Sequence, residues 1–122
     1  MPKKVLIVDD SRSVRMQVGY TLREAGFKVI EAKDGQEGLR LLQQHPDLAV
    51  IIADINMPEL DGISMTEKIK AGGSGVPVLI LTTETVREVV EKAREAGAVA
   101  FITKPFQPEQ LVRAVKKIIS PG

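Results

Sequence analysis

Residues 48–62 read LAVIIADINMPELDG, and this stretch contains both the pattern and the chemistry from which the fold can be predicted. Its first six residues, Leu48–Ala53, are apolar and rich in β-branched side chains, which is typical of a strand covered on both faces. An acidic residue, Asp54, follows directly, Pro58 shapes the loop after it, and Gly62 falls in the first turn of the next predicted helix. Four further short apolar runs resemble this one: Val5–Val8, Phe27–Ala32, Val76–Leu81 and Ala98–Ile102.

Amphipathic segments separate these apolar runs. The first has Val14, Val18 and Leu22 on one face at helical spacing and ends near Gly26. Similar patterns cover residues 38–42, 63–69, 86–93 and 111–119, with Pro108 near the first turn of the last one. Strands that alternate with helices predict a doubly wound α/β fold with a parallel sheet. We expect residues 1–122 to form one domain, with Ser120-Pro121-Gly122 ending the last helix.

The composition excludes several classes of function. There is no cysteine and only one histidine, so disulfides, thiolate catalysis and zinc sites built from cysteine or histidine are excluded. The net charge of +1 and the aromatic content of 3% argue against nucleic-acid binding, which favours basic stripes with stacking side chains. No apolar run approaches the roughly 20 residues of a membrane span or the form of a signal peptide. We therefore expect a cytoplasmic, monomeric protein that binds neither membrane nor nucleic acid.

Polar side chains follow four of the five predicted strands. Asp9 and Asp10 follow the first, Asp54 the third, Thr82 ends the fourth, and Lys104 comes just after the fifth. Ligands of such folds bind at the carboxyl ends of the strands. Three carboxylates there would repel one another unless a cation joined them, and an all-oxygen ligand set suits Mg²⁺. With a lysine and a hydroxyl opposite, one carboxylate could accept a phosphoryl group, since such catalysis is mostly positioning and charge stabilisation.

Each of these residues also has an ordinary structural reading. Asp10 or Ser11 could cap a helix that begins near Arg12. Asp54 could be a turn residue, and Lys104 a solvated surface charge. Only their coincidence at the strand ends favours the chemical reading.

Four motifs in order resemble a known family. They are Val8-Asp9-Asp10-Ser11, the block from Asp54 to Gly62, Leu81-Thr82-Thr83-Glu84, and residues 101–106, which read FITKPF. From Val5 to about Ile119 the chain resembles the receiver domain of bacterial two-component response regulators, and within it the single-domain chemotaxis regulators. The resemblance implies a flavodoxin-like (βα)5 sandwich whose five-stranded parallel sheet has the order 2-1-3-4-5.

The resemblance also implies roles for individual residues. Asp54 would accept the phosphoryl group, Lys104 would contact a phosphoryl oxygen, and the Thr82 hydroxyl would move toward the phosphate while Phe101 rotates. Asn56 and Glu84 would tune the lifetime of the phosphorylated state, which we expect to be short. Mg²⁺ would be bound by Asp9, acting through water, by Asp10 and Asp54 directly, and by the main-chain carbonyl of Asn56. The family also implies a cis bond between Lys104 and Pro105. We expect Asp61 to cap the third helix. Thr83 departs from the family, which commonly has a small alanine or glycine at this position.

The function implied is a signalling switch and not a conventional enzyme. A sensor histidine kinase would donate the phosphoryl group, and the surface of the fourth helix, fifth strand and fifth helix would bind an output protein, such as a flagellar motor switch protein in chemotaxis. The alternative within the family is a phosphorelay intermediate or a non-flagellar adaptor.

Two alternative functions lie outside the family. A magnesium-dependent aspartyl-phosphate phosphatase would need a second aspartate two residues after the nucleophile, where this chain has Asn56. A flavin-binding electron carrier would need a glycine- and hydroxyl-rich loop after the first strand, where this chain has Asp9-Asp10-Ser11-Arg12.

Overall fold

A computed structural model describes residues 2–119 of the chain. Strands and helices alternate throughout: β1 (Lys4–Val8), α1 (Arg12–Glu24), β2 (Lys28–Ala32), α2 (Gly35–Gln44), β3 (Leu48–Ala53), α3 (Gly62–Ala71), β4 (Val78–Thr82), α4 (Arg87–Ala96), β5 (Ala100–Thr103) and α5 (Pro108–Ile119). The predicted end of the last helix at residues 120–122 lies outside the described part.

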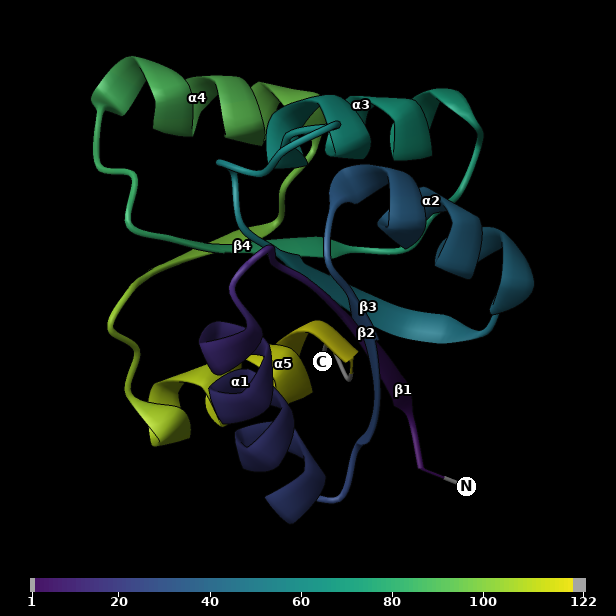
Figure 1. Ribbon diagram of the computed structural model, residues 1–122, viewed down its shortest axis with the longest axis vertical. Coiled ribbons are helices and arrows are strands. Elements are labelled where there is room, and N and C mark those ends of the chain that lie inside the picture. Colours follow the sequence, from purple (N-terminus) through teal and green to yellow (C-terminus); the bar gives the residue numbers. More distant parts are fainter. Residues whose placement is uncertain (1, 120–122) are drawn as a thin grey trace.

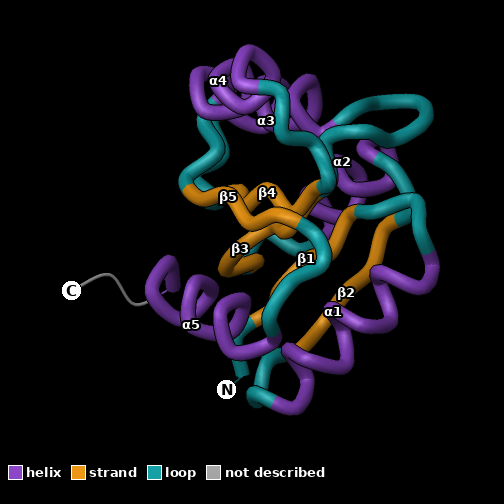
Figure 2. Tube along the Cα trace, turned by 90° about the vertical axis from the view of Figure 1, so that its left-hand side faces the viewer, coloured by secondary structure: helices purple, strands orange, loops and turns teal. Residues whose placement is uncertain are grey.

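All five strands are parallel and follow the order β2-β1-β3-β4-β5. Helices α1 and α5 lie together on one face of this sheet, and α2, α3 and α4 cover the other (Figure 1). The order reverses direction at β1, where β2 and β3 flank it on opposite sides (Figure 2). The predicted doubly wound, flavodoxin-like fold and its strand order are thus confirmed.

The sheet divides the interior into two apolar layers. Leu6, Ile51 and Ile80 point into the layer under α2, α3 and α4. Val5, Ile52 and Leu79, their neighbours in sequence, point into the layer under α1 and α5. Because alternate residues of a strand face opposite sides, the central strands are apolar throughout, which explains their continuous runs.

Helix caps shift the element boundaries from those predicted. Phe27 and Ala98 were expected to begin strands, but their N–H groups donate to Leu22 and Ala93, in the preceding helices, at 3.0 and 3.1 Å. These bonds close the helix ends around Gly26 and Gly97, whose φ angles of 95° and 119° suit glycine. Each strand consequently begins one or two residues later than its apolar run.

The start of α2 was also predicted too late. The Asp34 carboxylate accepts the Glu37 N–H at 2.8 Å, and this cap starts the helix at Gly35 instead of Gly38. Within residues 2–119, no helix combines the length and the apolar character that crossing a bilayer requires.

Candidate functional site

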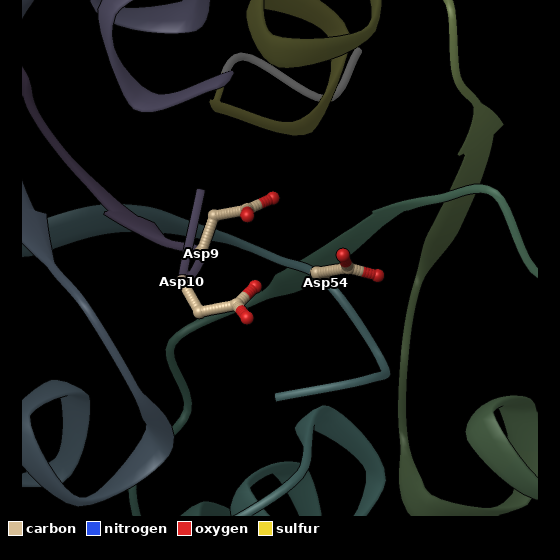
Figure 3. A group of neighbouring side chains, drawn as sticks. All are labelled: Asp9, Asp10 and Asp54. Carbon is tan, nitrogen blue, oxygen red and sulfur yellow. The ribbon is translucent and has the colours of Figure 1, made fainter. Parts of the chain in front are cut away.

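Three acidic side chains meet where β1 and β3 end. Asp9 and Asp10 directly follow β1, and Asp54 directly follows β3. The Asp54 N–H donates to the Val8 carbonyl oxygen at 3.1 Å, so the pairing of the two central strands continues into the site. Figure 3 shows the three carboxylates facing the same space from these two chain segments.

The carboxylates of Asp9, Asp10 and Asp54 form a group that fits a hard cation. One oxygen from each lies within 4.8 Å of the others. Asp9 and Asp54 are buried, at 2% and 8% exposure, whereas Asp10 is exposed and leaves the group open to solvent on one side. Oxygen ligands around an open position are the arrangement that Mg²⁺ prefers, because it keeps part of its water shell. The residues present therefore fit Mg²⁺.

Lys104 links two members of this acidic group. It follows β5, and its N–H donates to the Thr82 carbonyl oxygen of the neighbouring strand at 2.9 Å. Its Nζ lies 2.9 Å from Asp9 Oδ2 and 2.9 Å from Asp54 Oδ2. The bond between Lys104 and Pro105 is cis, as the family resemblance implied.

These contacts change the proton affinity of Lys104. Burial lowers its pKa, but the hydrogen bonds and charges of Asp54 and Asp9 together outweigh burial, so the pKa rises above the ordinary value of 10.5. The ammonium therefore stays charged at neutral pH, and it supplies the site with a fixed positive charge beside Asp54.

The other carboxylate oxygen of Asp54, Oδ1, also accepts hydrogen bonds. Oδ1 accepts the hydroxyl of Thr82 at 2.5 Å and the N–H of Ile55 at 2.7 Å. Thr82 is fully buried, and its Oγ1 accepts the Glu84 N–H at 3.2 Å. The hydroxyl expected to move toward a phosphate thus already lies against the unmodified carboxylate, and it connects Asp54 to the loop between β4 and α4.

The segment after Asp54 turns back against it. Asp61 caps α3 as predicted, since its carboxylate accepts the Ser64 N–H at 2.8 Å. Gly62 donates its N–H to the Ile55 carbonyl oxygen at 2.8 Å. A Cβ at Gly62 would overlap the main-chain carbonyl of Asp54. Only glycine can therefore occupy the start of α3 at this distance from the acceptor residue.

The remaining predicted residues lie around this centre. Asn56 is exposed, and the Glu84 side chain accepts the Val86 N–H ahead of α4 at 3.2 Å. Phe101 is half-buried and packs against the apolar layer under α2, α3 and α4. Thr83 is exposed and lines a surface hollow together with Lys104.

The sequence left open whether Asp10 or Ser11 caps α1, and the structure shows that Ser11 does. Its hydroxyl accepts the Val14 N–H at 3.3 Å at the start of α1, which leaves the Asp10 carboxylate available to the acidic group. Sequence reasoning missed Arg15, which donates to the main-chain oxygen of Asp9 at 2.6 Å. Its only signal was an arginine one turn into the helix that follows the two aspartates.

Comparison with known proteins decides the family. The model of the family described as "Response regulator receiver domain" matches residues 5–116. The chain belongs to the response regulator receiver domain family. Receiver structures of high similarity include the Vibrio cholerae chemotaxis protein CheY4, with a TM-score of 0.90, 38% identity, and coverage of 97% of this chain and 99% of that one. The CheY of the Borrelia burgdorferi CheX-CheY-BeF3-Mg complex gives a TM-score of 0.92 at 29% identity over 98% of this receiver and 91% of that chain.

Curated relatives of this receiver have two kinds of output. The transcriptional regulatory protein PdtaR of Mycobacterium tuberculosis is 40% identical over 98% of this chain, which spans 58% of that protein. A chemotaxis protein CheY homolog of Campylobacter jejuni is 35% identical over 98% of this chain and 94% of its own length. The family is therefore shared by relatives with different outputs.

Proposed function

We propose that this receiver domain accepts a phosphoryl group on Asp54 from a sensor histidine kinase, in a reaction that requires Mg²⁺. The observation that carries the proposal is the set of groups around Asp54. An ammonium, a buried hydroxyl and a main-chain N–H contact its two oxygens, and two further carboxylates stand beside it.

The chemistry follows from these contacts. An oxygen of Asp54 attacks the phosphorus of a phosphohistidine, so that an O–P bond forms while the N–P bond breaks and the imidazole leaves. Lys104 and Thr82 then donate to phosphoryl oxygens instead of to the free carboxylate. Asp9, Asp10, Asp54 and the Asn56 carbonyl would hold Mg²⁺, whose charge offsets that of the phosphoryl oxygens.

The change in Thr82 would carry the signal. The Glu84 N–H donates to this hydroxyl. When the hydroxyl moves to a phosphoryl oxygen, Glu84 and the loop before α4 would move with it. Phe101 on β5 would adjust to the new position of Thr82, and the surface of α4, β5 and α5 would change for an output protein. Asn56 and Glu84, at the rim of the site, would set the lifetime of the phosphorylated state.

A phosphorylation assay tests the acceptor. Incubation with acetyl phosphate and Mg²⁺ is expected to add one phosphoryl mass to the wild type and none to Asp54→Asn, as read by intact mass spectrometry and peptide mapping. Asp61→Asn is a matched control, because it removes a charge nearby while asparagine still caps α3. Labelling of Asp54→Asn equal to that of the wild type, or an adduct mapped to another residue, would overturn the proposal.

For the output we propose chemotaxis through a flagellar motor switch protein, in a cytoplasmic, monomeric receiver of residues 1–122. The relatives of nearly equal length that carry the name CheY support this choice. A relay or adaptor role in another pathway is the second candidate, favoured by the 40% identity to PdtaR. Beryllofluoride-dependent capture of a purified motor switch protein, absent with Asp54→Asn, distinguishes the two.

A further inference from the structure

Arg15 contacts the main chain of the acidic group. Its Nη1 donates to the main-chain oxygen of Asp9 at 2.6 Å, and its Nε donates to Glu31 Oε1 at 3.2 Å. Arg15 belongs to α1 and Glu31 to β2, so the guanidinium bridges two elements beneath the loop that carries the aspartates. The Arg15 side chain is only 16% exposed. A short, charge-assisted bond from a partly buried guanidinium is a strong one.

The bond fixes the peptide unit between Asp9 and Asp10. The Asp9 N–H already donates to the Ala32 carbonyl oxygen at 3.1 Å, so Arg15 completes the hydrogen bonding of this residue's main chain. Because the peptide unit is planar, the direction of the Asp9 carbonyl also sets where the chain continues into Asp10. The place of Asp10 relative to Asp9 therefore depends on Arg15, whereas the Asp9 carboxylate itself is held by the Ser11 N–H and by Lys104, each at 2.9 Å.

We infer that Arg15 is a positioning residue for Mg²⁺, acting through the Asp9–Asp10 peptide, with Glu31 orienting its guanidinium. The inference rests on the proposed metal site and adds to it a residue that does not touch the ion. Partners of this kind, which orient the ligands of a metal, typically change its affinity about 10- to 100-fold when they are removed.

Electrostatics alone predicts the opposite effect. Arg15 carries a positive charge near a site for a divalent cation, so its removal would strengthen Mg²⁺ binding if charge were its only influence. A positioning role predicts weaker binding, because Asp10 loses its fixed place relative to Asp9. The sign of the change in Mg²⁺ affinity thus separates the two roles.

The test is Arg15→Met, with Arg23→Met as the matched control. Arg23 Nη2 lies 3.6 Å from Glu31 Oε2, and its side chain is 54% exposed, so the control removes a charge from the same glutamate and leaves Asp9 untouched. Calorimetric titration with MgCl2, without any phosphodonor, is expected to give a dissociation constant raised about tenfold for Arg15→Met and close to wild type for Arg23→Met. At saturating Mg²⁺ the phosphorylation rate of Arg15→Met should return close to that of the wild type.

An unchanged or lowered dissociation constant in Arg15→Met would overturn the inference, and so would equal weakening in the Arg23 control. If Arg15→Met does not fold, Arg15→Lys replaces it, because one ammonium keeps the charge but lacks the planar fork that contacts both Asp9 and Glu31. This variant should also bind Mg²⁺ more weakly. A wild type that binds no Mg²⁺ would instead refute the proposed metal site itself, along with the positioning role.

Discussion

Asp54 has a hydrogen-bond partner at each oxygen before any chemistry occurs. Thr82 and the Ile55 N–H contact Oδ1, and Lys104 contacts Oδ2. These donors do not have to be recruited when a phosphoryl group arrives, since they need only pass from the carboxylate to the new oxygens. Preorganised donors of this kind lower the cost of reorganisation during the reaction.

Lys104 should make the stability of the free protein depend on alkaline pH. Because its pKa is raised in the folded chain, its stabilising contribution is complete below the ordinary value of 10.5 and is lost as the pH rises through the higher folded value. We expect the difference in unfolding free energy between wild type and Lys104→Met to shrink across that range. Urea titrations without Mg²⁺ from pH 9 upward measure it, and a difference that stays constant or grows would contradict this assignment.

At this scale, the residue types together with their places at the predicted strand ends were enough to predict which side chains gather. Asp9, Asp10, Asp54, Thr82 and Lys104 all meet, because parallel strands end at one edge of the sheet. The position of Thr82 against the free carboxylate was not predictable, since it depends on a side-chain rotamer and on the Glu84 N–H. Arg15 was missed because it contacts the main chain of Asp9, and its place one turn into α1 was the only signal in the sequence.

At the scale of elements, α3 begins directly against the main chain of the acceptor residue. Its first residue, Gly62, packs directly on the main chain of Asp54, and the cap at Asp61 fixes where the helix begins. The cap at Asp61 was predicted from the sequence. Sequence could not reveal the close approach itself, because it results from the packing of a helix start against a strand end.

Gly62→Ala should be strongly destabilising, because the added methyl group would overlap the Asp54 carbonyl and force the backbone to shift. The expected loss is about 2 kcal/mol or more of unfolding free energy, as for overpacked cores. Gly75→Ala is the matched control, since nothing lies within 4 Å of its Cβ and its φ is not positive. It should change the stability by less than about 0.5 kcal/mol. Equal urea midpoints for the two variants would show that the close approach is absent in solution.

For the molecule as a whole, the alternation of apolar runs with amphipathic segments was sufficient to predict a parallel sheet covered by helices. The boundaries were less predictable, because glycine-assisted caps at Gly26 and Gly97 decide where each chain segment leaves its helix. The strand order came from the family resemblance, since apolar runs do not encode which strands are neighbours.

Binding of Mg²⁺ should stabilise the whole domain. A ligand that binds only the folded chain adds about 2.7 kcal/mol when its concentration is 100 times its dissociation constant. Thermal unfolding in MgCl2 should therefore shift upward for the wild type relative to NaCl of equal ionic strength. Asp10→Asn should show much less of this shift, because Asp10 is exposed and its loss removes a ligand with little effect on packing. An identical shift in both proteins would exclude Asp10 as a ligand.

The division of the interior by the sheet has a consequence for how a change at Asp54 reaches the surface. Asp54 directly follows β3, a central strand of the sheet that separates the half of the molecule built on α1 and α5 from the half built on α2, α3 and α4. The proposed output surface of α4, β5 and α5 takes one helix from each half, so a change at the end of β3 would be transmitted to both sides of the sheet at once.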